Sequence, residues 1–281
     1  TTLPKLTQIR DNLHSNYLSA LFPNDKWLQW KGYTKRDSSR KKAKIITAYM
    51  ENKTRESRFR QTISRLLYDY IDYGNAFIIP SFERRMHNSP DGSKVVGFIG
   101  PRGNRISPYD IVFNPLAATF EDTFKVIRSI KTVGEIHKLA ASEPENTFWI
   151  EALNKRMQLR KSMSGYSKED WDKAVQYDKD GFGSMYEYIL GDSVEILEFY
   201  GDYYDSATNT LKENVIITVI DRCSVAREVP INTLDGRSPI RHVGWRLRSD
   251  NLWAMGPLDN LVGMQYRIDH LENLKADAMD L

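Results

Sequence analysis

The pattern that most constrains the fold is an amphipathic helix followed at once by a strand. Apolar residues recur at helical spacing from residue 59 to residue 71, and Gly74 is suited to end that helix. The next residues, 75–80, form a short apolar run that ends in proline, which is typical of a buried strand. A chain that passes from helix to strand in this way needs both kinds of element in one core. We therefore expect the α+β class.

The remaining periodicity predicts a helical front, an antiparallel β region and a long C-terminal helix. Other helices are expected over residues 6–21, 45–50, 136–139, 149–157 and 171–175. Extended segments are expected over 75–80, 94–99, 107–115, 124–130, 194–200, 215–220 and 224–229. The first two should form a hairpin, and the last three an antiparallel meander. Domain boundaries are expected near residues 74 and 255, which gives parts 1–74, 75–255 and 256–281.

Helix starts can be predicted from capping residues. Ser38 or Ser39 is expected to cap the helix over 45–50, and Thr132 with Glu135 matches a capping box. The last helix is expected to start at Gly256-Pro257, because proline suits a first helical turn. Its apolar pattern is still periodic at Leu281, and the chain begins without Met, so we expect a natural protein longer than this sequence.

Positive charge is concentrated near the N-terminus. Residues 26–85 hold 15 Lys and Arg against 6 Asp and Glu, whereas the whole chain has a net charge of only +3, so the remainder is acidic. The candidate polyanion contacts are Arg40, Lys41, Lys42, Lys44, Arg55, Arg58 and Arg60. Trp27, Trp30 and Tyr33 lie close by and could stack on bases. The alternative is a solvated helix face whose lysine stems cover the edge of the core.

Motifs for catalysis, metals or membranes are missing from the sequence. The histidines are scattered at positions 14, 87, 137, 242 and 270, and there is neither a phosphate-binding glycine loop nor a nucleophile elbow. A single cysteine, Cys223, excludes an internal disulfide and is expected to be a buried or turn thiol. The run 178–183 lacks oxygen ligands at Phe182 and Ile189, where a calcium loop needs them. We expect no enzyme activity, no metal and no cofactor.

The order of several short motifs resembles that of a bacteriophage portal protein of the podovirus-like type. Residues 69–78 resemble the portal junction in which a helix ends at Tyr-Gly and a wing strand follows. Residues 107–115 resemble the proline-flanked Asp-Ile-Val-Phe-Asx-Pro strand, and residues 194–205 resemble the Glu-Phe-Tyr-Gly-Asp strand and turn. Gly256-Pro257-Leu258-Asp259-Asn260-Leu261, with Gln265, Arg267 and residues 270–274, is similar to the helix that leads from wing to stem.

This resemblance implies a wing followed by the start of a stem helix. It implies a ring, usually a dodecamer, at one capsid vertex of a virion assembled in the host cytoplasm. Double-stranded DNA would pass through it without sequence specificity, and its partners would be terminase, capsid protein and a tail or adaptor protein. Side chains that could pack against neighbouring subunits, or within their own core, are Leu261, Met264, Ile268 and Leu271. Alternatives are a metal-dependent nuclease or other polyanion-processing enzyme, and a nucleic-acid-binding module.

Overall fold

The structure, a computed structural model, describes residues 3–142, 148–162 and 191–279, apart from residues 25, 33, 35, 207, 234 and 235. It contains helices and two antiparallel sheets, which confirms the α+β class. The chain divides into two compact units, which are described separately below. The first unit combines residues 1–109 with 239–281, and the second comprises residues 110–238, so these limits do not coincide with the boundaries expected at 74 and 255.

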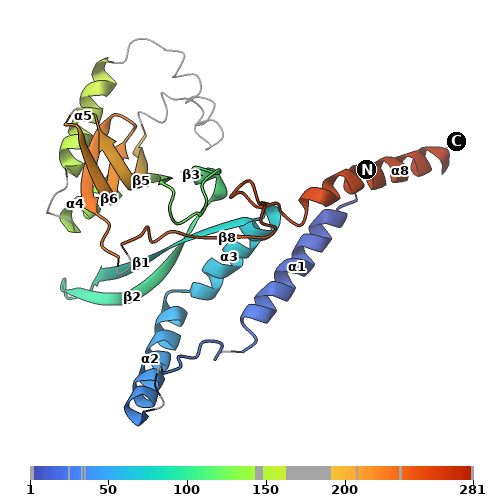
Figure 1. The fold of residues 1–281 in the computed structure, drawn as a ribbon, viewed down its shortest axis with the longest axis horizontal. Coiled ribbons are helices and arrows are strands. Elements are labelled where there is room, and N and C mark those ends of the chain that lie inside the picture. Colours follow the sequence, from blue (N-terminus) through green and yellow to red (C-terminus); the bar gives the residue numbers. More distant parts are fainter. Residues whose placement is uncertain are drawn as a thin grey trace. The chain divides into compact units, whose positions relative to one another are not determined.

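The first unit combines three N-terminal helices and one C-terminal helix with a small sheet (Figure 1). The N-terminal helices are α1 (Lys5–Leu21), α2 (Asp37–Glu56) and α3 (Phe59–Asp72). Strand β1 (Asn75–Asn88) lies between β2 (Lys94–Ile106) and β8 (Arg241–Gly244). The predicted hairpin is confirmed and is longer than expected, since β1 and β2 pair from Phe77 with Ile106 to Asn88 with Lys94. The 3-10 turn η2 (Asp259–Leu261) and helix α8 (Val262–Met279) complete this unit.

Glycine makes the sharp junction between α3 and β1 possible. Gly74 has a φ of +70°, a conformation that L side chains rarely adopt, so the helix ends there as predicted. A Cβ at this position would lie 2.4 Å from the backbone nitrogen of Gly256. The junction therefore also receives the segment that leads into α8. Behind it, Leu66, Leu67, Ile71 and Phe77 are buried.

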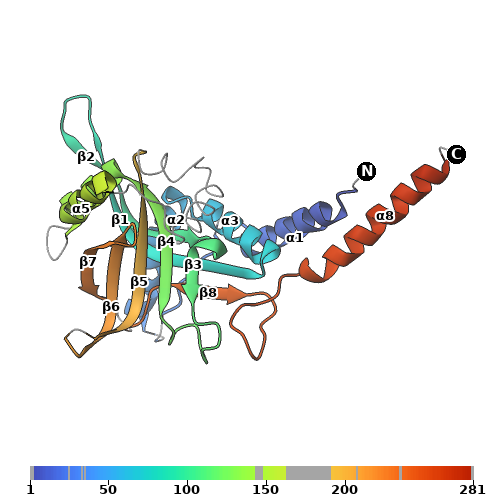
Figure 2. The ribbon, with the colours of Figure 1, turned by 90° about the horizontal axis from the view of Figure 1, so that it is seen from above.

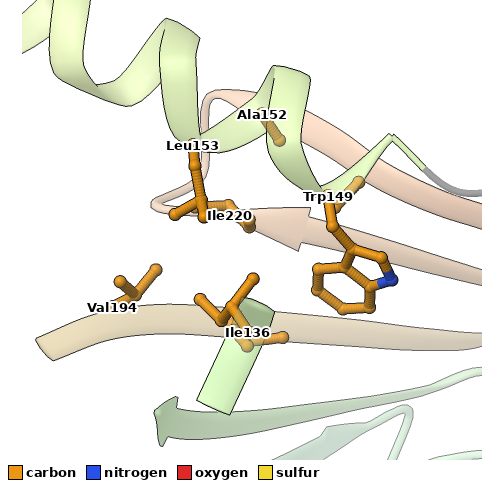
Figure 3. Close-up of a cluster of buried hydrophobic side chains, with 8 residues drawn as sticks. Ile136, Trp149, Ala152, Leu153, Val194 and Ile220 are labelled. Carbon is orange, nitrogen blue, oxygen red and sulfur yellow. The ribbon is translucent and has the colours of Figure 1, made fainter. Parts of the chain in front are cut away.

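The second unit is a five-stranded antiparallel sheet with helices on one face. Figure 2 shows its strands in the order β3-β4-β5-β6-β7. The strands are β3 (Ile111–Phe113), β4 (Lys125–Thr132), β5 (Ser193–Asp205), β6 (Thr210–Ile220) and β7 (Ser224–Pro230), and the last three form the predicted meander. Helices α4 (Val133–Ser142) and α5 (Trp149–Ser162) cover its core (Figure 3). There, Ile136, Trp149 and Leu153 pack against Val194, Ile196 and Ile220.

The capping box at α4 is confirmed. The backbone N–H of Glu135 donates to Thr132 Oγ1 at 3.2 Å, and the N–H of Thr132 donates to Glu135 Oε2 at 2.9 Å. These hydrogen bonds lower the pKa of the Glu135 carboxyl, because they stabilise its charged form. The reciprocal bonds fix the point at which β4 turns into α4.

Three local predictions are wrong. Helix α2 begins at Asp37 after an extended Arg36, so Ser38 and Ser39 lie inside the first turn instead of capping it. Pro108–Asp110 forms the 3-10 turn η1 and not extended chain, which leaves only Ile111–Phe113 as a strand. The last helix does not begin as an α-helix at Pro257: Asp259–Leu261 form the 3-10 turn η2, and α8 follows it from Val262. The N–H of Gly256 donates to Asp259 Oδ2 at 2.7 Å, which caps this first turn. The helix expected over 171–175 and the run 178–183 lie outside the described residues.

Candidate polyanion groove and exposed C-terminal helix

The basic residues predicted near the N-terminus gather on α2, where they face solvent. Arg40, Lys41, Lys42 and Lys44 are all exposed within its first two turns. The nearest carboxylate to Arg40 is that of Asp37, 3.9 Å away, and both side chains are largely solvated, so this pair neutralises little. The N-terminal turn of a helix already carries a partial positive charge, which adds to the side-chain charges. This end of α2 therefore has a strongly positive potential.

A groove of about 780 Å³ lies between α2 and the preceding loop. Its lining includes four cationic side chains, Lys26, Lys31, Arg40 and Lys44, together with the acidic Glu51. Trp30 also lines the groove, and 44% of its surface is exposed. Lys26 and Lys31 were missing from the predicted contacts; the signal that could have found them is their position on either side of Trp27 and Trp30 in the sequence.

The other predicted cations separate into different environments. Arg55 and Arg60 line a smaller pocket of about 110 Å³ together with Trp27 and Phe59. The guanidinium carbon of Arg60 lies 5.9 Å from the centroid of the Phe22 ring, a cation–π distance. Arg58 is the linker between α2 and α3, with a φ of +56°. Lys41 and Lys42 line neither pocket. The structure thus brings together only part of the predicted set.

The two tryptophans of the loop have different roles. Trp27 stacks on Phe59 at a centroid distance of 5.8 Å and meets Phe22 edge-on at 4.8 Å, so it packs the loop against α3. The backbone N–H of Trp30 instead donates to Thr47 Oγ1 of α2 at 3.0 Å, which leaves its indole half-exposed beside the cations. Only Trp30 is placed to stack on a ligand. Tyr33, the third predicted aromatic, lies outside the described residues.

A cluster of ion pairs joins α1, α3 and β2 in the first unit. Arg105 makes two hydrogen bonds, of 2.5 and 2.6 Å, to the buried carboxylate of Asp69, and Arg10 donates to Asp72 at 2.7 Å. Burial raises the pKa of Asp69, although Arg105 opposes that shift. These arginines are engaged by carboxylates that belong to the fold. We therefore interpret the cluster as structural.

The side chain of Asn75 fixes the segment that leads into α8. Its Oδ1 accepts hydrogen bonds from His242 Nε2 and from the N–H of Ala254, both at 2.9 Å, and its Nδ2 donates to the carbonyl oxygen of Ala254 at 2.8 Å. The His242 ring stacks on Phe77 at 4.6 Å. Burial lowers the pKa of His242 to about 4, so the ring is neutral at pH 7 and donates from Nε2.

Helix α8 is held through a polar side. Gln265 Oε1 accepts the N–H of Leu6 at 3.3 Å, and Asp269 Oδ1 accepts the N–H of Leu3 at 2.9 Å. The N–H of Leu6 belongs to the first turn of α1 and lacks a partner inside that helix, whereas Leu3 directly precedes the N-cap. Asp269 also places a negative charge at the positive end of α1. These contacts fix α8 beside α1 without covering its apolar side chains.

Three of the four apolar residues predicted for subunit packing are exposed to solvent. Met264, Ile268 and Leu271 are 62%, 37% and 55% exposed, whereas Leu261 is half-buried and lies in η2 instead of α8. Among the described residues, α8 contains no buried side chain. The four positions are separated by three, four and three residues, the spacing of a helix–helix seam. Packing in the chain's own core, the alternative interpretation, is not how the structure places them.

The side chains that could bind a metal ion or act as a nucleophile do not gather in one place in the described part of the chain. Among the residues that the structure describes, no three His, Cys, Asp or Glu side chains come close enough to hold a metal ion. Cys223 lies in the turn between β6 and β7, where its N–H donates to the carbonyl oxygen of Ile220 at 3.0 Å. No helix within the described ranges is long and apolar enough to cross a membrane.

No protein-family model matches the chain, and no curated protein matches it.

Proposed function

We propose that this chain forms the wing and the start of the stem of a bacteriophage portal protein. In this proposal, copies of the chain form a ring, of usually twelve subunits, at one capsid vertex, and DNA passes through the ring during packaging and ejection. The observation that carries the proposal is the seam of α8, defined as Leu261, Met264, Ile268 and Leu271. Three of its four side chains, those of Met264, Ile268 and Leu271, are exposed in the single chain, and a regularly spaced apolar seam of this kind is suited to contact with another subunit.

The way α8 is anchored supports a cyclic assembly. Gln265 and Asp269 fix the helix to α1, and Asn75 fixes the segment before it, so the seam is presented from a defined base. In a ring, each subunit offers one surface to a different surface of the next, and the same contact repeats until the ring closes. A rigidly presented helix favours a fixed rotation between neighbours, which closure requires. Terminase, capsid protein and a tail or adaptor protein are the partners that this function implies.

Imaging of the full-length product tests the proposal. Negative-stain electron microscopy should show closed rings, and the same preparation should show no nuclease or ATPase turnover with Mg²⁺ or Mn²⁺. A compact monomer whose metal-stimulated turnover disappears when one of its own carboxylates is replaced would instead support the enzyme alternative. A monomer that binds DNA without turnover would support a nucleic-acid-binding module.

A further inference from the structure

We propose that the groove between α2 and the loop before it, lined in the loop by residues 26, 29–32 and 34, binds a single-stranded polynucleotide. Its phosphates would bind Lys26, Lys31, Arg40 and Lys44, and an unpaired base would stack on the indole of Trp30. The inference rests on the proposed function in one respect, which is that nucleic acid comes into contact with this surface. It goes further by naming the class of nucleic acid that the groove binds.

The cations of the groove are available to a ligand. Among the described residues, Lys26, Lys31 and Lys44 have no ion-pair partner, and Arg40 has only the solvated Asp37 at 3.9 Å. Four positive side chains face one acidic lining residue, Glu51. A phosphodiester backbone supplies repeated negative charges, and its binding to such cations releases counterions. The groove therefore favours an extended polyanion over a neutral or cationic ligand.

Hydrogen bonds between the loop and α2 hold the groove in one arrangement. The loop is attached to α2 by the bond from the Trp30 N–H to Thr47 Oγ1 and by a bond of 2.7 Å between Thr34 Oγ1 and Ser39 Oγ. Gly32 lets the backbone approach closely, since a Cβ there would lie 3.1 Å from Ser39 Cβ. Thr47 Oγ1 in turn donates to the carbonyl oxygen of Ala43 at 2.9 Å. Little ordering is left to be done on binding, which favours affinity.

The half-exposed indole distinguishes single strands from duplexes. Sequence-tolerant binding of single strands combines a basic groove with aromatic side chains on which bases stack. In a duplex the bases stack on one another and pair, so their faces are not available to a side chain in a lateral groove. The groove volume of about 780 Å³ is within the range of small-molecule sites and is large enough for a nucleotide.

Fluorescence titration of the full-length chain tests the inference. The probes are labelled oligothymidylate of about 12 nucleotides, the matching duplex, and inorganic polyphosphate as a ligand with charge but no bases. Trp30→Leu removes the stacking surface and keeps an apolar side chain. Lys44→Glu reverses a charge in the groove, and Lys94→Glu makes the same change at an exposed lysine of β2 that does not line the groove. Circular dichroism checks that each variant remains folded.

The inference predicts a preference for oligothymidylate over both other probes. Trp30→Leu should weaken oligothymidylate binding about fivefold or more and leave polyphosphate binding unchanged. At 0.15 M salt, Lys44→Glu should weaken binding at least about tenfold and Lys94→Glu less than about threefold, because Lys94 does not line the groove and salt screens exposed charges. Equal affinity for strand and duplex, no effect of Trp30→Leu, or equal effects of the two lysine variants would each overturn it.

The same preparation separates this inference from the proposed function. Rings that do not prefer single strands would refute the groove and leave the portal proposal standing. A monomer that binds oligothymidylate in a Trp30-dependent way would contradict the portal proposal and support the groove.

Discussion

At the scale of single residues, a neutral histidine helps to hold the base of α8. His242 Nε2 donates to Asn75 Oδ1, and the same oxygen accepts the N–H of Ala254. A protonated imidazole would place a charge on the face of the Phe77 ring, inside a half-buried site with little water to solvate it. The surroundings of Asn75 therefore favour the neutral ring of His242. Protonation of this ring at acid pH should destabilise the fold at this position.

The free energy of unfolding should decrease as the pH is lowered through the window set by His242. Its pKa is about 4 in the folded chain and about 6.5 when unfolded, so the unfolded chain binds more protons between these values. The contribution is complete above pH 6.5 and is lost as the pH falls towards 4. It should amount to about 2 kcal/mol, allowing for the ring's partial exposure. Denaturant titrations of wild type and His242→Gln should converge as the pH drops, whereas parallel curves would contradict this role.

The sequence alone could not show which side chains pack in the fold and which remain exposed to a ligand. The sequence groups Trp27 with Trp30 and places seven cations nearby, yet Trp27 is used to pack Phe22 and Phe59. Which aromatic remains exposed depends on a tertiary contact, the bond between Trp30 and Thr47, which no local pattern encodes. Lys26 and Lys31 join Arg40 and Lys44 for the same reason, because the loop folds back along α2.

At the scale of elements, the α3–β1 junction shows where sequence patterns suffice. The periodicity of 59–71, the terminal Gly74 and the apolar run after it all act locally, and the structure follows them. The capping box at Thr132 is equally local and was predicted correctly. The start of α8 was not, since Asp259–Leu261 form a 3-10 turn where a proline-led α-helix was expected. Short 3-10 turns are frequent at the ends of α-helices, so an apolar period does not determine which kind of turn comes first.

Replacing Gly74 should destabilise the first unit. Gly74→Ala introduces a side chain at a φ of +70° and a Cβ that would lie 2.4 Å from the Gly256 nitrogen, so backbone must move. The conformational strain alone costs about 1 to 2 kcal/mol, and the steric clash adds to it. Gly263→Ala is the matched control, because it lies in α8 with no atom within 4 Å of its added Cβ. The control should be neutral or stabilising by up to about 1 kcal/mol. Equal unfolding midpoints for both variants would contradict the assigned role of Gly74.

At the scale of the whole molecule, duplex DNA should bind through charge alone. The cations on α2 are exposed and carry no base-reading arrangement, so affinity should fall steeply with salt and be indifferent to sequence. Charge reversal of Lys41, Lys42 and Lys44 together should abolish this binding, since six units of charge are changed on one helix. Filter binding of two unrelated duplexes between low and physiological salt measures both effects. A strong preference for one duplex, or binding that survives the triple variant, would contradict it.

The central claim is that the seam of α8 meets a neighbouring subunit. Ile268→Asp places a charge in this seam, whereas Tyr266→Asp places the same charge on the same helix, two residues away and so on nearly the opposite side. Tyr266 is 73% exposed and Ile268 is 37% exposed, so neither change should unfold the isolated chain. Circular dichroism should confirm that both variants remain folded. A buried and uncompensated charge at a subunit contact costs several kcal/mol, and in a ring that cost recurs at every interface.

Light scattering on the full-length protein gives the most direct test, because it measures the assembled mass in solution. Wild type and Tyr266→Asp should both have the mass of a closed ring, and Ile268→Asp should have the mass of a folded monomer. Rings of unchanged mass in Ile268→Asp, or a wild type that is monomeric at every concentration, would contradict the account.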